Sequence, residues 1–389
     1  MHSTIRSRPT VVKAATALTL VGLVGAALSG CSGTASASAG AVPKAKAQKA
    51  ASAETFGGMK GLVAAASAEG QLNVITLPPS WANYGKIIDG FKKKYPKIKI
   101  VSANPNGSSA DEVAAAKSQK GRNTAPDVFD MGTAVLQENL DLLAPYKVQN
   151  WSQVPDDYKD PSGKWIYDYT GLMSIGYDSS KITTPPTSVK DLLGPEYKGE
   201  VAIKGDPTQA NEAASAVYLA ALENGGSPDD IGKGVDYFSQ LKKAGNFISV
   251  LPTQATVNSG DTPVVLQWSY NNLAWGPAAG SAGNKDWKVV VPSGTALGSY
   301  YNQAINADAP HPAAARLWEE YIYSPEVQNL YLAAGAYPAM LKSMQTKSTV
   351  DTAVLKSVGE APSDFVQLSS DQATAAGKLL SAKWRAAVR

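Results

Sequence analysis

The chain is poor in the residue types that build many catalytic and metal-binding sites. Its 389 residues include one cysteine, Cys31, and two histidines. A single cysteine forms no disulfide bond within its own chain. His2 lies at the extreme N-terminus, and His311 lies between two prolines at an expected surface helix start, where we interpret it as structural. A serine–histidine–aspartate triad is therefore disfavoured, and the G-x-S-x-G, H-E-x-x-H and P-loop motifs are absent.

Long apolar runs are also scarce. One uncharged apolar run, Ala14–Leu28, follows a basic stretch that contains Arg6, Arg8 and Lys13. This run is shorter than the roughly 20 residues that a transmembrane helix needs. A basic stretch followed by a short apolar run is typical of an export signal. The sequence therefore predicts a protein that works outside the cytoplasm.

The end of this run, Leu28-Ser29-Gly30-Cys31, resembles the lipobox of bacterial lipoproteins. The resemblance implies that residues 1–30 are a signal peptide and that Cys31 is lipidated, with acyl chains such as palmitate. Two or more acyl chains hold a protein stably on a membrane. We therefore expect a lipid anchor on the outer side of the cell membrane. A secretory signal with an incidental cysteine is the alternative.

Excess charge is absent from the body of the chain. The first 30 residues hold three basic and no acidic residues, so the remainder has 33 of each. Binding of nucleic acid through bulk charge is therefore not expected. Residues 31–52 are rich in Ser, Ala, Gly and Lys without an apolar period, which predicts a flexible tether. About 330 residues follow, which is enough for two lobes.

Strand-like and helix-like segments alternate along this body, which predicts an α/β architecture. The expected strands cover residues 72–76, 98–101, 127–131, 201–203, 264–268, 289–292 and 300–305. The expected helices cover residues 84–95, 110–119, 209–224 and 231–243, with further helices from His311 onward. We expect Ser109 to be the N-cap of the second helix.

Four segments carry a resemblance to a known family. They are Ala125–Asp130, Asp191–Gly199 with its Tyr-Lys-Gly ending, Gly260–Trp268, and Ala304–Gln328. In this order and spacing they resemble the type II extracellular solute-binding proteins of ABC importers. The similarity covers about residues 70–342 and is greatest to the branch with polyamine-, ferric-ion- and phosphonate-binding members.

The resemblance implies an α/β, two-lobed periplasmic-binding-protein type II fold with a hinge of crossing strands and an interlobe cleft. The crossing strands are expected near residues 172–177 and 300–305. The expected parts are a first lobe from residues 53–173, a second lobe from 174–298, a return to the first lobe at 299–345, and C-terminal helices at 346–389 that pack on the lobes.

The resemblance also implies that the chain captures a small polar solute and delivers it to the permease subunits of an ABC importer. No cofactor or metal is implied, and we expect a monomer. Residues expected to contact the solute are Trp81, Tyr84, Ser108, Thr133, Asp206, Trp268, Tyr270 and Tyr301. Packing in the core of a lobe is the alternative role for each of the aromatic residues.

The residues leave the solute class open. The aromatic residues and Asp206 favour an amine, although Gln209 and Tyr301 stand where the polyamine branch has further acids. Loops at three expected helix starts, residues 107–109, 132–133 and 206–208, favour an anion such as a phosphonate. A zwitterion such as an aminophosphonate would satisfy both. Ferric ion is disfavoured, because the ferric-binding members have adjacent tyrosines where this chain has Tyr270 alone.

Two other function classes stay open. A secreted, lipid-anchored enzyme such as a glycoside hydrolase would need paired carboxylates, and the pairs Asp127/Asp130 and Asp156/Asp157 are available. No further motif supports catalysis. A solute sensor without transport would have the same sequence features as a transport receptor.

Overall fold

The computed structural model describes residues 42–277, 282–292, 295–359 and 365–389. All of them belong to one compact unit, Ala41–Arg389. Cys31 and the expected signal peptide lie outside the described residues. Within the described ranges, no helix combines the length and the apolar character that crossing a membrane requires.

The first lobe begins with a strand–helix–strand unit. Strands β1 (Gln71–Ile75) and β2 (Lys99–Ala103) pair in parallel, with α3 (Tyr84–Lys94) between them in the chain. Helix α3 buries Tyr84, Ile87, Ile88 and Phe91, a face of i, i+3, i+4 and i+7 spacing. These elements lie close to the ranges that the apolar pattern predicts.

Helix α4 (Ser109–Ser118) follows β2 and begins one residue earlier than predicted. Its N-cap is Ser108 and not Ser109. The Ser108 hydroxyl accepts from the backbone N–H of Asp111, and the Asp111 carboxylate accepts from the backbone N–H of Ser108. Ser109 also has an acid three residues later, Glu112, but that carboxylate accepts from Thr76 and from the backbone N–H of Asp130, so the reciprocal capping box forms at Ser108.

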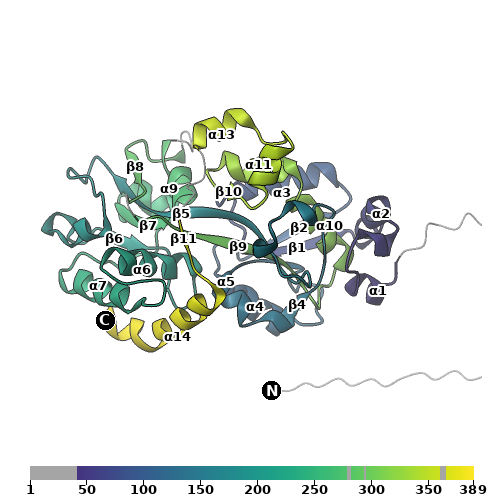
Figure 1. Ribbon diagram of the computed structural model, residues 1–389, viewed down its shortest axis with the longest axis horizontal. Coiled ribbons are helices and arrows are strands. Elements are labelled where there is room, and N and C mark those ends of the chain that lie inside the picture. The colour runs from purple at the N-terminus through teal and green to yellow at the C-terminus, as the bar shows by residue number, and fades with distance from the viewer. Residues whose placement is uncertain (1–41, 278–281, 293–294, 360–364) are drawn as a thin grey trace, which may run out of the picture. The chain divides into compact units, whose positions relative to one another are not determined.

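Two long strands connect the lobes (Figure 1). Strand β5 (Ile166–Asp178) pairs with β9 (Leu297–Asn306) over residues 166–172, and its remaining residues pair with β7 (Val264–Trp268) and β8 (Trp287–Val290). The other end of β9 pairs with β3 (Val128–Gly132) and β4 (Leu143–Ala144) in the first lobe. The predicted crossing segments fall inside β5 and β9, while the exact lobe boundaries stay a prediction.

The second lobe surrounds β6 (Val201–Ile203), which pairs in parallel with β7. Every residue of these two strands is buried, as expected for parallel strands covered on both faces. The helices of this lobe are α6 (Asn211–Glu223), α7 (Gly232–Lys243), α8 (Gln254–Ser259) and α9 (Ser269–Trp275).

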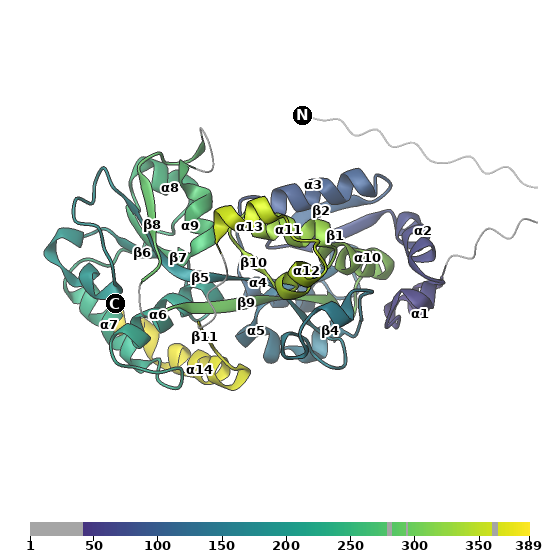
Figure 2. The same cartoon turned by 45° about the horizontal axis from the view of Figure 1, so that its top comes forward.

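The C-terminal part contributes small strands and helices to both regions (Figure 2). They are α10 (Pro312–Ile322), α11 (Pro325–Ala333), β10 (Tyr337–Pro338), α12 (Leu341–Thr346), α13 (Thr352–Val358), β11 (Val366–Gln367) and α14 (Ser370–Ala387). The first lobe also contains α5 (Thr133–Gln137). Short 3-10 helices cover Ala53–Phe56, Leu140–Leu142, Trp151–Gln153, Asp156–Tyr158, Val189–Leu193 and Pro195–Tyr197.

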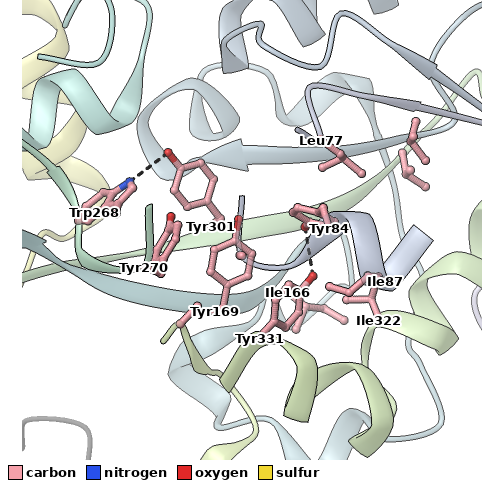
Figure 3. Close-up of a cluster of buried hydrophobic side chains, with 14 of the residues drawn as sticks. Leu77, Tyr84, Ile87, Ile166, Tyr169, Trp268, Tyr270, Tyr301, Ile322 and Tyr331 are labelled. Carbon is pink, nitrogen blue, oxygen red and sulfur yellow. Dashed lines mark hydrogen bonds between the residues drawn. The ribbon is translucent and has the colours of Figure 1, made fainter. Parts of the chain in front are cut away.

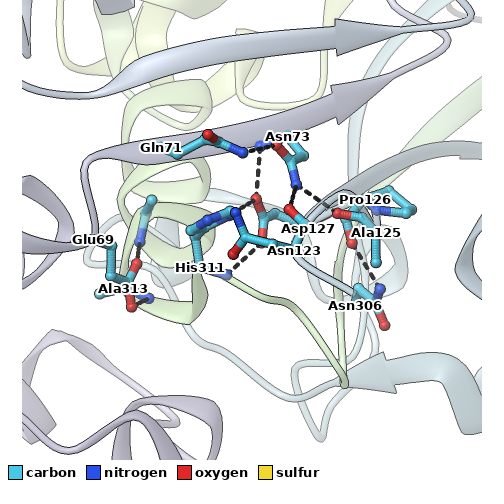
Figure 4. A network of polar contacts seen from close by, with 11 residues as sticks. Glu69, Gln71, Asn73, Asn123, Ala125, Pro126, Asp127, Asn306, His311 and Ala313 are labelled. Atoms are coloured by element: carbon cyan, nitrogen blue, oxygen red, sulfur yellow. Dashed lines mark hydrogen bonds and ion pairs between the residues drawn. The ribbon is translucent and has the colours of Figure 1, made fainter. Parts of the chain in front are cut away.

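His311 is buried, whereas the sequence predicts a surface position for it. The residue is 5% exposed, and its Nδ1 lies 2.9 Å from Oδ2 of Asp127 (Figure 4). The same carboxylate accepts from the backbone N–H of Asn73 at 2.6 Å. The network ties β1, the start of β3 and the start of α10 together, so the structural role expected for His311 fits this place.

The segment before the first lobe also differs from its prediction as a tether. Residues Lys44–Gln48 form α1, which precedes α2 (Met59–Glu69), and Ala47 and Ala50 are buried. The buried Arg316 guanidinium donates to the carbonyl oxygens of Gln48 at 2.7 Å and Ala50 at 2.8 Å. Residues 42–52 are therefore packed and not a free tether. The partner that fixes them lies more than 260 residues away, so local composition could not reveal it.

Candidate ligand-binding site

A cleft of about 560 Å³ lies between elements of the two lobes. Its first-lobe wall comes from the loops after β1 and β2, the first turn of α4 and the end of β3. Its second-lobe wall comes from the loop after β6, the first turn of α6, residues 251–255 and α9. Most of these segments follow the carboxyl ends of strands, where ligands bind in open α/β sheets.

The first-lobe loops at the cleft hold several non-glycine residues in the left-handed region of backbone conformation. Thr76 has φ 53°, Asn83 has φ 64° and Asn104 has φ 40°. For a β-branched residue such as Thr76 this conformation is a strained exception. Its hydroxyl donates to Oε1 of Glu112 at 2.6 Å, which helps to hold the loop in place. Backbone strain of this kind gathers at functional sites more often than elsewhere.

Trp81 and Tyr301 line the cleft. Figure 3 shows Tyr301 with the neighbouring Tyr169 and Tyr270. The Trp81 ring meets the rings of Tyr270 and Tyr301 edge-to-face, with centroids 5.7 and 5.4 Å away. Tyr169 stacks on Tyr301 at 5.9 Å and meets Tyr270 edge-on at 5.6 Å. The Trp81 indole N–H donates to the Tyr169 hydroxyl. The four rings form one packed group, which we call the aromatic group.

Two buried carboxylates adjoin the aromatic group, one from each lobe. Asp130 of β3 accepts from the Tyr169 hydroxyl at 3.1 Å through Oδ2. Glu212 of α6 accepts from the backbone N–H of Trp268 at 3.0 Å and from Asn271 at 2.9 Å through Oε1. Burial raises the pKa of Asp130 to about 7. Burial also raises the pKa of Glu212 to about 7, partly opposed by the positive charge of Lys204.

A third buried acid and one base also line the cleft. Glu112 is 1% exposed, and its Oε2 accepts from the backbone N–H of Asp130 at 3.0 Å. Burial raises the pKa of Glu112 well above its usual value. Lys204 donates to the carbonyl oxygen of Pro252 at 3.0 Å and lies over the ring of Trp275 at 5.0 Å. Burial lowers the pKa of Lys204.

Three of the nine buried side-chain atoms that have no hydrogen-bond partner in the described part of the chain belong to the aromatic group or to the carboxylates beside it. Oδ1 of Asp130, Oε2 of Glu212 and the hydroxyl of Tyr270 are buried and have no hydrogen-bond partner among the described residues. Buried polar atoms in folded proteins nearly always have a partner. A bound molecule with hydrogen-bond donors would supply partners for the two carboxylate oxygens.

Four of the eight residues expected to contact a solute line the cleft. They are Trp81, Ser108, Asp206 and Tyr301. Asp206 is exposed, and its Oδ1 accepts from the backbone N–H and the hydroxyl of Thr208, both at 2.8 Å. Its carboxylate is thus already engaged within its own loop.

The other four lie behind this lining. Tyr270 belongs to the aromatic group, and the fully buried Trp268 donates from its indole N–H to the Tyr301 hydroxyl at 3.4 Å. Tyr84 is fully buried and accepts from Gln303 at 2.9 Å and from the Tyr331 hydroxyl at 3.1 Å. The buried Thr133 hydroxyl accepts from Asn302 at 3.2 Å. A direct contact of any of the eight with a solute stays a prediction.

The expected anion-binding loops use their polar groups internally. At residues 107–109 the capping box of Ser108 and Asp111 places a carboxylate where an anion would bind. At residues 206–208, Asp206 accepts the hydrogen bonds of Thr208. Loops whose N–H groups and hydroxyls are already paired offer little to a bound anion.

The sequence pattern does not indicate Glu112, Glu212 or Lys204 as site residues, and it indicates Asp130 only as half of a possible catalytic pair. Signals for two of them exist in the sequence. Glu212 is the one charged residue near the start of an otherwise apolar, alanine-rich helix, and Asp130 lies close to the carboxyl end of a buried strand. Charged residues are almost never fully buried without a partner, so an acid inside an apolar element indicates a possible site.

The comparison with protein families gives one match. The family model described as "Bacterial extracellular solute-binding protein" matches residues 123–362, more than half of the chain. A search of curated proteins gives no match.

Solved structures with the same fold include the periplasmic binding protein P5PA, at 18% identity and TM-score 0.64, covering 82% of this chain and 100% of that one. AfuA from Actinobacillus pleuropneumoniae, with exogenous fructose-6-phosphate bound, has 19% sequence identity and a TM-score of 0.63. The match covers 82% of this chain and 98% of that one. A periplasmic thiamin binding protein has 15% sequence identity and a TM-score of 0.62, and the match covers 82% of this chain and 96% of that one. These likenesses confirm the two-lobed type II fold expected from the sequence.

Proposed function

Because the chain belongs to the bacterial extracellular solute-binding proteins, we propose that it captures a small organic cation in its cleft and delivers it to an ABC importer permease. Proteins of this family bind small solutes and work with such permeases, and they are not enzymes. The proposed finer points are the amine character of the solute and a membrane anchor at Cys31.

The observation that carries the amine proposal is the pair of unpartnered carboxylate oxygens beside the aromatic group. Asp130 and Glu212 approach the cleft from different lobes, and neither has an ion-pair partner among the described residues. A buried carboxylate without a partner is costly. An ammonium group between the two would pair with both oxygens and would favour the arrangement of the lobes that brings them together.

The aromatic group would contact the apolar part of such a solute or its charged head. Trp81 and Tyr301 line the cleft directly, and each cation–π contact contributes about 0.5–2 kcal/mol. Affinity would be the surplus of these contacts over the cost of ordering and closure.

Lys204 favours a solute with an acidic group as well. It lies on the second-lobe wall with Glu212, and it is the one basic residue among the described residues that line the cleft. A zwitterion such as an aminophosphonate could place its ammonium near the two carboxylates and its anion near Lys204. This second candidate predicts that an amine with an anionic group binds more tightly than the matching simple amine.

A thermal-shift screen tests the solute class. The body from residue 41, which forms one compact unit, would be heated with putrescine, spermidine, 2-aminoethylphosphonate, phosphate, thiamine, ferric citrate and simple sugars. A compound at 100 times its Kd stabilises the fold by about 2.7 kcal/mol. We expect a shift with an amine or aminophosphonate. A shift with phosphate or a neutral sugar and none with the amines would contradict the proposal.

Glu212→Gln tests the proposed contact between Glu212 and the solute, with the amine that gives the largest thermal shift. The variant should bind that amine about 10- to 100-fold more weakly, because a hydrogen bond to a charged group contributes about 1.5–3 kcal/mol. Glu223→Gln is the matched control, since Glu223 ends the same helix and accepts from Ser188 away from the cleft. Equal affinities of both variants by calorimetry would remove Glu212 from the site.

A separate experiment tests the proposed membrane anchor at Cys31. Cys31→Ala should move the protein from the membrane fraction of the producing cells to the soluble extracytoplasmic fraction, because the variant lacks the thiol that carries the acyl chains. An unchanged membrane association would refute lipidation at Cys31.

A further inference from the structure

Helix α14 (Ser370–Ala387) lies beyond residue 362, where the family match ends. Figures 1 and 2 show it running from the side of α5 in the first lobe to the side of α7 in the second lobe. The short strand β11 before it pairs with the connecting strand β9 at Leu297 and Gly298. The C-terminal segment thus contacts both lobes and a strand that joins them.

Its attachment to the second lobe is aromatic and hydrogen-bonded. The buried Trp384 meets Phe238 of α7 edge-to-face at 5.3 Å and Phe247 at 6.2 Å. Gln372 donates from Nε2 to Asp229 at 2.9 Å, and its carbonyl oxygen accepts from the Tyr218 hydroxyl at 3.0 Å. Large buried aromatic side chains supply most of the energy of such contacts.

Its contact with the first lobe is made of smaller residues around a second cavity of about 100 Å³. Ala134 and Val135 of α5 and its C-cap Glu138 line this cavity, and Ala373 and Gly377 line it from α14. A Cβ added at Gly377 would meet no atom within 4 Å. Voids forfeit dispersion contacts, so this interface is weaker than the one around Trp384.

The second cavity borders the proposed solute site. Gln209, Ala210 and Asn211, which lead into α6, line both this cavity and the interlobe cleft. A change in how α5 and α14 meet would therefore displace the same residues that precede Glu212.

We propose that α14 is a strap that fixes the relative position of the two lobes in the solute-free protein. The strap is held firmly on the second lobe and bears on α5 of the first. Any movement of the lobes along β5 and β9 has to slide or separate the α5–α14 contact, so that contact biases the populations of lobe arrangements. Since solute affinity depends on the competent population, the strap also tunes affinity. This inference rests on the two-lobed fold and not on the identity of the solute.

Distance distributions between the lobes test the strap. The body from residue 41 has no native cysteine, so Lys93→Cys and Lys198→Cys place one spin label on an exposed site of each lobe. Ala373→Glu should weaken the α5–α14 contact, because Glu138 lines the same cavity. In pulsed electron–electron double resonance without solute, we expect the population outside the main wild-type distance to rise about fivefold or more.

Two further variants keep the test decisive. Ala375→Glu adds the same charge to an exposed position of α14 and should leave the wild-type distribution unchanged. Val135→Ser weakens the same contact from α5 and should act like Ala373→Glu, which covers the case in which Ala373→Glu fails to fold. The proposal is overturned if Val135→Ser and any folded Ala373→Glu protein keep the wild-type distribution, or if Ala375→Glu alters it equally.

Discussion

Asp127 and Asp130 stand at the two ends of one short segment, but their carboxylates differ in hydrogen bonding. At one end, the Asp127 carboxylate accepts from the backbone N–H groups of Asn73 and His311 and contacts Nδ1 of His311 (Figure 4). At the other end, Asp130 accepts from the Tyr169 hydroxyl, and its Oδ1 is left without a partner in the described part of the chain. Both carboxylates are buried. Satisfied hydrogen bonding therefore separates a structural acid from one that is available to a solute.

Trp81 and Trp268 show the same contrast. Trp268 is fully buried and belongs to the core, whereas Trp81 is half-buried and lines the cleft. Sequence analysis nominates both for the solute. The structure gives them different environments, and the first prediction separates them.

Trp268→Ala should produce the largest loss of stability, about 3–5 kcal/mol, because it leaves a cavity where a large buried side chain was. Trp81→Ala should cost less than about 2 kcal/mol, since its side chain is partly exposed, and should weaken amine binding instead. Denaturant unfolding and calorimetric titration of both variants measure the two effects. If Trp268→Ala kept the unfolding free energy of the wild type and lost its affinity for the amine, Trp268 would be a residue that contacts the solute.

Asp127→Ala should cost about 3 kcal/mol of unfolding free energy, because three hydrogen bonds to a buried carboxylate are lost together. Asp308→Ala is the matched control, since Asp308 pairs with Lys120 at the surface, where an ion pair contributes less than about 1 kcal/mol. Urea unfolding compares them. A cost for Asp127→Ala no larger than that of the control would end the distinction drawn between Asp127 and Asp130.

The arrangement of strands and helices could be predicted from the sequence because it follows from local pattern. The i, i+3, i+4 spacing of Ile87, Ile88 and Phe91 fits α3, and the apolar run at 264–268 fits β7. The family resemblance added the two crossing strands. These features depend on periodicity and order, which a single sequence contains.

The lining of the cleft is harder to predict from the sequence, because it depends on contacts between residues that are far apart in the chain. Asp127 and Asp130 stand in one apolar segment, and only partners 54 and 184 residues away from Asp127 distinguish them. The sequence predicts a tether at residues 42–52 because the carbonyl contacts of Arg316 leave no local signal. Hydrogen-bond satisfaction is a property of the folded chain.

The last prediction concerns the dependence of stability on pH through Asp130. Its pKa rises from the usual 3.8 to about 7 on folding, with burial as the main cause. Between these values the folded state binds more protons than the unfolded state, so the stability of the solute-free protein should fall as the pH rises from about 4 to about 7. Asp130→Asn should remove the contribution of Asp130 to this slope and should be more stable than the wild type at pH 8, where the wild type has an ionised Asp130 beside the buried Asp168.

Melting profiles from pH 4 to 8 measure this effect, with the exposed Asp141→Asn expected to follow the wild type. A bound amine should reverse the dependence, because an ammonium beside Asp130 favours its ionised form. The wild type should therefore gain more from an amine at pH 8 than at pH 5, and Asp130→Asn should lose that difference. An amine whose effect is independent of pH in both proteins would show that the unpartnered oxygen of Asp130 does not meet the solute, and Glu212 would then be the one acid of the proposed pair left to hold it.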